Sequence, residues 1–336
     1  MPIYGWQFNA IDPHELQLGL VRILFFGWLA GTTRWSKTIQ LADVHMRCPE
    51  LWQPSGFIPA LAGPAVASAL TRHARELTLL WQVASVLAVA GVLFPIGNIV
   101  CIVLFTILVG YTQQFGKTSR SFNIVPFAGV YLSCAPADAL ALLPLGNVVS
   151  PALGHSWPVQ LGRLTLATIW FVAGFAKVRH SGIRWAWSDN LQLLIRLHLM
   201  DYTFMRPAAP RLSRLVVSHD LVCRLCAAGV ILVELSYPLA LCSTVLAICI
   251  VPLSILSLWS FHLLLGPAFV PLAVSTVLFW FPFDWAARSC GAIPACAAFV
   301  SAVLIVSRLP LWLARRSIRP VRSMAGSPMK APAASL

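Results

Sequence analysis

The chain has 336 residues, of which 58% are hydrophobic and only 10% are charged, and its mean hydropathy is +0.79. This composition excludes an ordinary soluble domain and is typical of a polytopic helical membrane protein. The formal net charge of +13 does not require a nucleic-acid partner, because the placement of the basic residues along the chain accounts for it.

Apolar stretches recur along the chain, each near the ~20 residues that a membrane-spanning helix needs. They lie at about 16–33, 77–94, 96–114, 123–145, 158–177, 221–242, 244–265, 268–283 and 292–314. We therefore predict an all-α fold, a helical transmembrane bundle of about eight to nine spans over residues 1–315. The joins at 95 and 243 fit either a hairpin or one long bent helix.

The two ends of the chain carry further expectations. Residues 1–15 contain no lysine or arginine, so we expect no cleavable signal and a first span that stays in the protein. Residues 316–336 are basic and rich in serine, proline and alanine, which predicts a disordered tail.

The basic residues are distributed unevenly between the two predicted sides of the membrane. With the N-terminus outside, only Arg288 falls on the outer side, whereas 18 of the 24 lysines and arginines fall on the inner side. These 18 are Arg34, Lys37, Arg47, Arg72, Arg75, Lys117, Arg120, Arg179, Arg184, Arg196, Arg206, Arg211, Arg214, Arg315, Arg316, Arg319, Arg322 and Lys330. Because cytoplasmic loops retain positive charge, the C-terminus is predicted to be cytoplasmic, at the inner membrane if the source is bacterial.

Residues 179–220 form the longest internal segment outside the predicted spans. Trp185, Trp187 and six arginines suit an interfacial helix. Pro207 and Pro210 fit a solvated loop equally well.

Most of the nine cysteines lie inside predicted spans, where cysteine behaves as a small hydrophobe. His219, Cys223 and Cys226 share one helical face, but no fourth ligand is evident, and we assign no metal. Cys290 and Cys296 flank a predicted outer turn and could pair in an oxidising compartment. We expect free thiols.

Isolated polar groups occur inside or beside the spans, and these usually face the bundle interior. They are Arg22, Asp138, Arg163, Lys177, Glu234, His262 and Arg308. Lys177 ends an apolar run and either snorkels to the interface or serves a function. We expect Asp138 or Glu234 to lie close to Arg22 or Arg163.

Short motifs along residues 12–283 occur in a particular order. They are Asp12-Pro13 with Leu16, Arg22 and Phe25-Phe26-Gly27; Lys117-Thr118-Ser119 with Asp138; Ala173-Gly174-Phe175-Ala176-Lys177-Val178 followed by Ser181-Gly182-Ile183-Arg184-Trp185; Glu234-Leu235-Ser236; and Phe261-His262. In order and spacing they resemble the vitamin K-dependent gamma-carboxylase-like family, also called the horizontally transferred transmembrane domain family, in its short bacterial form.

The resemblance implies a chemistry for Lys177. In the family's carboxylases the matching lysine deprotonates a reduced naphthoquinone, which reacts with oxygen to give a base that abstracts a glutamyl γ-proton before carbon dioxide is captured. Lysine suits this role because burial disfavours its charged form. The resemblance also makes Glu234, His262 and Asn123 candidate site residues.

Three features depart from that family. Its carboxylases carry an Asn-His pair where Phe122 and Asn123 stand here; Asn123 can donate a hydrogen bond to an oxyanion but cannot act as an acid or base near neutral pH. The sequence also lacks the large β-rich C-terminal region of the animal enzymes. The charge distribution places Lys177 near the cytoplasmic face, whereas the animal carboxylases keep their lysine towards the lumen.

Two hypotheses about function follow. The first is a membrane enzyme that uses Lys177 on a quinol or another lipophilic small molecule. The second is a non-catalytic membrane partner in maturation, export or redox, comparable to the DoxX-like proteins, whose glycine-lysine motif is similar. Transport is less favoured, because we detect no inverted repeat or paired broken helices.

Overall fold

A computed structural model describes residues 13–31, 57–112, 124–135, 143–144, 156–182, 184–200, 207–266 and 269–317. These residues are predominantly helical, which confirms the predicted all-α class. Two short strands, β1 (Val92–Phe94) and β2 (Leu143–Pro144), pair in parallel beside the helices. Asn123, Asp138 and most of the predicted tail lie outside the described residues.

The helices follow one another with short connections. They are α1 (Pro13–Ala30), α3 (Phe57–Arg72), α4 (Ala74–Ala90), α5 (Ile96–Thr112), α6 (Ile124–Ser133), α7 (Trp157–Ser181), α8 (Arg184–Trp187), α9 (Asn190–Met200), α10 (Pro210–Val217), α11 (Asp220–Ser236), the 3-10 helix η6 (Tyr237–Leu241), α12 (Thr244–Leu265), α13 (Val270–Trp280), α14 (Phe283–Cys290) and α15 (Ala292–Ser317).

Three helical stretches are long and apolar enough to cross a membrane: Trp157–Ser181, Asp220–Leu241 and Thr244–Leu265. Shorter apolar helices cover Gln17–Ala30, Ile96–Tyr111, Ile124–Ser133, Val270–Trp280 and Ala292–Arg308. The total of eight to nine spans stays a prediction. Many large apolar side chains, such as Leu80, Val86 and Leu232, are more than half exposed, as the lipid-facing surface of a membrane protein would be.

At both joins that fitted either a hairpin or one long bent helix, near residues 95 and 243, the helix is interrupted. α4 ends at Gly91, which takes the left-handed conformation that suits glycine, and α5 starts after β1. α11 passes into η6 next to Pro238, whose ring cannot continue the hydrogen-bond ladder, and Ser243 is extended before α12.

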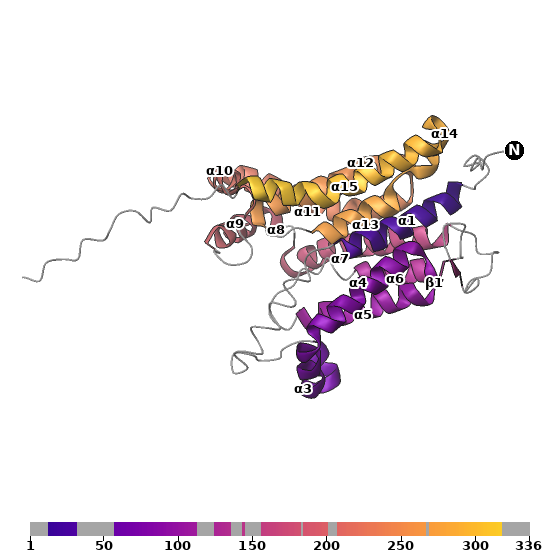
Figure 1. Ribbon diagram of the computed structural model, residues 1–336. Coiled ribbons are helices and arrows are strands. Elements are labelled where there is room, and N and C mark those ends of the chain that lie inside the picture. Colours follow the sequence, from indigo (N-terminus) through magenta and orange to yellow (C-terminus); the bar gives the residue numbers. More distant parts are fainter. Residues whose placement is uncertain are drawn as a thin grey trace, which may run out of the picture.

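The long helices run side by side, with α8, α9 and α10 at one end of the bundle and α14 and β1 at the other (Figure 1). The segment between α7 and α11, which fitted an interfacial helix or a loop, therefore contains three short helices. Pro210 starts α10 at a position where proline suits a helix.

The main core forms where α1 and α13 meet the surrounding helices. Phe25 of α1, Trp81 of α4, Phe105 of α5, Phe279 of α13 and Phe299 of α15 are each 0 or 1% exposed and belong to one cluster. A second, smaller cluster joins α8 and α9 to α11 and the end of α12. The main cluster packs against the N-terminal part of α7, and the smaller one holds the helices next to the C-terminus of α7.

Candidate functional site

Lys177 forms an ion pair with Glu234 across the interface between α7 and α11. The Lys177 Nζ atom lies 2.5 and 2.6 Å from the two carboxylate oxygens of Glu234. The lysine side chain is 24% exposed and the glutamate side chain only 6%. The structure thus joins two of the four predicted site residues, which are 57 positions apart in the sequence.

Gly174 allows the two helices to approach at this point. A Cβ atom on Gly174 would lie 2.8 Å from the Cβ of Glu234, which is closer than real Cβ atoms come, and 3.1 Å from the Leu235 side chain, which is tighter than most Cβ contacts. Gly174 also lies three residues before Lys177, so both face the same side of α7. The glycine therefore brings the backbone of α11 close enough for Glu234 to reach the lysine.

Two further groups surround the Lys177 amine. Its Nζ atom lies 5.6 Å from the ring centroid of Trp185 on α8, in cation–π geometry. It also donates to the Ala173 carbonyl, at 3.4 Å. The ammonium group is thus stabilised by a carboxylate, an aromatic ring and a backbone carbonyl, and this charge compensation permits an ionised lysine between apolar helices.

The described contacts of His262 differ from those of Lys177 and Glu234. It is 7% exposed near the end of α12, and its Nδ1 atom lies 2.9 Å from the Gly266 carbonyl. Because a carbonyl oxygen can only accept, Nδ1 carries the proton in this contact. The His262 carbonyl accepts hydrogen bonds from Gly266 and Ala208. These bonds hold the end of α12 against the chain that enters α10.

The described contacts of the two arginines that were expected near a carboxylate involve aromatic rings and a backbone carbonyl. Arg22 is 2% exposed, and its guanidinium lies 5.2 Å from the ring centroid of Phe94. Arg163 donates from Nε to the Phe279 carbonyl at 2.8 Å and lies over the ring of Trp280 at 5.2 Å. Glu234 pairs with Lys177, and the other expected acceptor is outside the described residues.

The cysteines that the structure describes belong to no cluster suited to a metal. Cys223 donates a weak hydrogen bond from Sγ to the Val216 carbonyl, at 3.2 Å. Within the described part of the chain, no group of three or more His, Cys, Asp or Glu side chains could hold a metal ion. Cys290 and Cys296 are free thiols.

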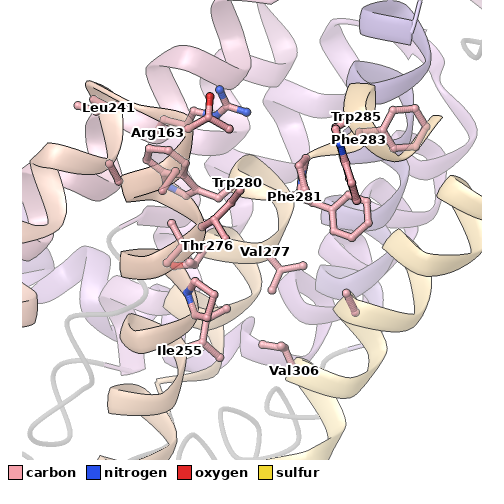
Figure 2. A pocket seen from close by; sticks show the side chains of 18 of the residues that line it. Arg163, Leu241, Ile255, Thr276, Val277, Trp280, Phe281, Phe283, Trp285 and Val306 are labelled. Carbon is pink, nitrogen blue, oxygen red and sulfur yellow. The ribbon is translucent and has the colours of Figure 1, made fainter. Parts of the chain in front are cut away.

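A cleft lies at the other end of α7, next to Arg163. It has a volume of about 1030 Å³ and is bordered mainly by α12, α13 and α15. Figure 2 shows Arg163 and Trp280 at one end, and Ile255 and Val306 at the other. The cleft was not predicted from the sequence; of the residues that border it, Arg163 was singled out there as a polar group inside or beside a span.

Comparisons with known proteins give no further identification: no family model, no curated protein and no solved structure matches the chain.

Proposed function

We propose that this chain is a multi-pass integral membrane protein of about eight to nine spans that acts on a lipophilic small molecule, with Lys177 and Glu234 as a proton-transfer pair. The observation that carries the proposal is the contact of the Lys177 amine with both carboxylate oxygens of Glu234. An ionisable pair between two membrane-spanning helices is costly to maintain and is commonly retained for function.

The pair can make a basic amine available. When the Lys177 ammonium passes a proton to the Glu234 carboxylate, both groups become neutral, and a neutral pair suits an apolar environment better than two separate charges. The free amine then accepts a proton from an acidic hydroxyl of the substrate. The lysine is the more exposed partner, so it is the one that a substrate can approach.

The substrate class comes from the sequence resemblance. A reduced quinone is lipophilic, carries acidic hydroxyl groups and reaches the protein through the bilayer. Trp185 beside the lysine offers an aromatic face on which such a ring could stack. The described residues thus fit a quinol substrate.

The direct test uses Lys177→Arg, because arginine keeps the charge but does not release a proton near neutral pH. Purified protein is supplied with a reduced naphthoquinone, and oxygen uptake is measured together with thermal stability and quenching of tryptophan fluorescence by the bound quinol. We expect uptake above background for the wild type and none for Lys177→Arg, with stability and quenching retained. Lys330→Arg in the tail is the matched control and should behave as wild type.

The alternative is a non-catalytic membrane partner in maturation, export or redox. It is favoured by one observation: the Lys177 amine is already engaged by Glu234, Trp185 and the Ala173 carbonyl. Under this alternative the wild type neither consumes oxygen nor binds the quinol. Lys177→Arg then keeps any cellular phenotype of the wild type, while Lys177→Met destabilises the protein.

The orientation is proposed from charge. Arg179, Arg184, Arg196, Arg211 and Arg214 lie on or beside the helices at the α8–α10 end of the bundle (Figure 1). This end would face the cytoplasm. A topology reporter fused after Arg322 should then report the cytoplasm and one inserted near Gly154 the opposite side. The same side for both would contradict an odd number of spans between Gly154 and Arg322, and with it the nine-span topology.

A further inference from the structure

We infer that α9 and α10 lie in the interface of one membrane leaflet and bind anionic phospholipid, with their exposed leucines among the acyl chains and the arginines of α10 at the phosphate headgroups. In the proposed orientation this is the cytoplasmic leaflet. The inference rests on the proposed insertion of the bundle in a membrane and not on the proposed chemistry at Lys177. Both helices lie at one end of the bundle (Figure 1).

The position of α10 along the bundle is fixed by the end of α12. The Ala209 N–H donates to the Leu263 carbonyl at 3.0 Å. The Ser213 side chain is buried, and its Oγ atom lies 3.2 Å from the Leu264 carbonyl oxygen. α12 is one of the three helical stretches long and apolar enough to cross a membrane. α10 therefore lies where that span would leave the hydrocarbon and the headgroups would begin.

The exposed face of α9 is apolar. Leu193, Leu197 and Met200 follow one another at helical spacing and are 57, 56 and 70% exposed. Leu191 and Ile195, on the opposite side of the helix, are buried in the smaller cluster. A helix between a protein core and water normally presents polar residues to the water. The outer face of α9 instead suits contact with acyl chains.

The exposed face of α10 is divided between two kinds of side chain. At about 100° per residue, Leu212 and Leu215 fall on one half of this face, and Arg211 and Arg214 fall on the other. Ser213, which is buried, lies on the far side of the helix. A helix in the plane of the membrane interface has this division, with the apolar half in the acyl region and the basic half at the headgroups.

The charge at this end of the bundle complements a phosphate headgroup. Residues 179–224 hold seven arginines and no lysine or glutamate, against three aspartates, which are Asp189, Asp201 and Asp220. Even with each aspartate paired to one arginine, four arginines are in excess. Asp189 lies 3.7 Å from Arg224. Within the described part of the chain, neither Arg211 nor Arg214 has a carboxylate at ion-pair distance. Such basic segments beside a span bind anionic lipids.

The test locates the lipid on the full chain. Protein is reconstituted in nanodiscs with equal amounts of phosphatidylglycerol and phosphatidylcholine, and one of the two carries a photoreactive group on its acyl chain in each run. Cross-linked peptides are identified by mass spectrometry. We expect phosphatidylglycerol to label α9 and α10 more than phosphatidylcholine does. This excess should fall as salt is raised from about 0.1 to 1 M, because the screening length shortens from about 10 to 3 Å.

Paired variants test the arginines of α10. Arg211→Gln with Arg214→Gln should lower the phosphatidylglycerol labelling of α10 about fivefold for each arginine removed. Arg72→Gln with Arg75→Gln removes the same charge from exposed positions at the α3–α4 junction and should leave it unchanged. Thermal unfolding checks that each variant folds. If the glutamine pair at α10 does not fold, the salt series on the unchanged chain still tests the role of charge.

Several results would overturn the inference. They are equal labelling of α9 and α10 by the two lipids, no labelling of either helix, an equal loss in the α3–α4 control, and loss of the labelling when inorganic phosphate is added at constant ionic strength. A dimer in native mass spectrometry that the α10 glutamine pair dissociates would assign this face to a second copy of the chain.

Labelling of α12 by phosphatidylcholine separates the failures. Exposed apolar residues of α12, such as Ile248 and Leu256, should be labelled by either lipid if the bundle spans the membrane. Labelled α12 with unlabelled α9 and α10 would leave the membrane protein in place and reject the interfacial pair. Because oxygen uptake is not the readout, failure here is also distinct from failure of the proposed reaction.

Discussion

The two ends of α7 hold positive charge in different ways. At the C-terminal end, the Lys177 amine contacts both carboxylate oxygens of Glu234, so the local charge is balanced within the bundle. Near the N-terminal end, Arg163 donates a hydrogen bond to the Phe279 carbonyl and lies over the Trp280 ring. The arginine end also borders a cleft.

This difference separates two uses of a cation in a membrane protein. A lysine next to a carboxylate can exchange a proton with it, because both groups can become neutral. An arginine stays charged and presents fixed donors to an anion. The Lys177 end can therefore exchange a proton, whereas the Arg163 end keeps its charge. Each can be tested by a substitution that changes one end and not the other.

Glu234→Ala should have the largest effect on stability. It leaves Lys177 without its carboxylate between α7 and α11, and removing one partner of a buried ion pair costs about 3–5 kcal/mol. The free energy of unfolding in mixed detergent micelles is the measurement. Glu76→Ala, at an exposed position of α4, is the matched control and should change it little.

The double variant Lys177→Met with Glu234→Leu extends that prediction. Replacing both members of a buried pair by apolar residues is often neutral, so the double variant should recover most of the lost stability. Stability as low as that of Glu234→Ala would mean that the glutamate matters for packing rather than for charge compensation.

Gly174→Ala should have the next largest effect. The new methyl group would lie 2.8 Å from the Glu234 Cβ, and overpacking of this kind costs about 1–3 kcal/mol. The control is Gly229→Ala on α11, where a Cβ meets nothing within 4 Å. There the higher helix propensity of alanine should stabilise the protein by up to about 1 kcal/mol. Equal changes in the two variants would rule out close helix contact at Gly174.

Arg163→Lys should lower the free energy of unfolding by about 1–2 kcal/mol. Lysine cannot reproduce both the Nε hydrogen bond to the Phe279 carbonyl and the contact with the Trp280 ring. Arg211→Lys on the exposed face of α10 is the control and should stay within about 0.5 kcal/mol of wild type. Thermal unfolding of both variants provides the comparison. A tolerated Arg163→Lys would show that only the charge matters at this end.

The sequence predicted the all-α class because long apolar stretches leave few other folds for such a chain. It also identified Lys177 and Glu234 as polar groups that need partners, and the resemblance placed both among the site residues. It did not predict that they pair with each other. That pairing depends on which helices are neighbours and on their rotation about their own axes. The expectation was only that Asp138 or Glu234 would lie close to Arg22 or Arg163.

The cleft could not be predicted from the sequence. Its apolar border on α12 looks like any lipid-facing or core-facing helix, because Val251 and Ile255 fit both environments. The space arises because α13 packs against both α12 and α15. Such an arrangement is set by the packing of three helices and has no local signature, whereas Arg163 near the end of a span was a visible signal.

Trp185 should make the smallest contribution that can still be measured. A cation over a tryptophan ring is worth about 0.5–1 kcal/mol when partly exposed, as Lys177 is at 24%. Trp185 also packs against the small cluster of α9 and α11, so the single variant Trp185→Leu mixes the two effects. A double-mutant cycle with Lys177→Met isolates the contact, because the packing loss occurs in both backgrounds and cancels.

We expect a coupling energy between Trp185 and Lys177 near 1 kcal/mol. Trp187→Leu, at a 54% exposed position of α8, should couple to Lys177→Met by less than the error of the cycle. Zero coupling for Trp185 would mean that Glu234 alone stabilises the charge, and the two ends of α7 would then differ even more sharply in their use of aromatic rings.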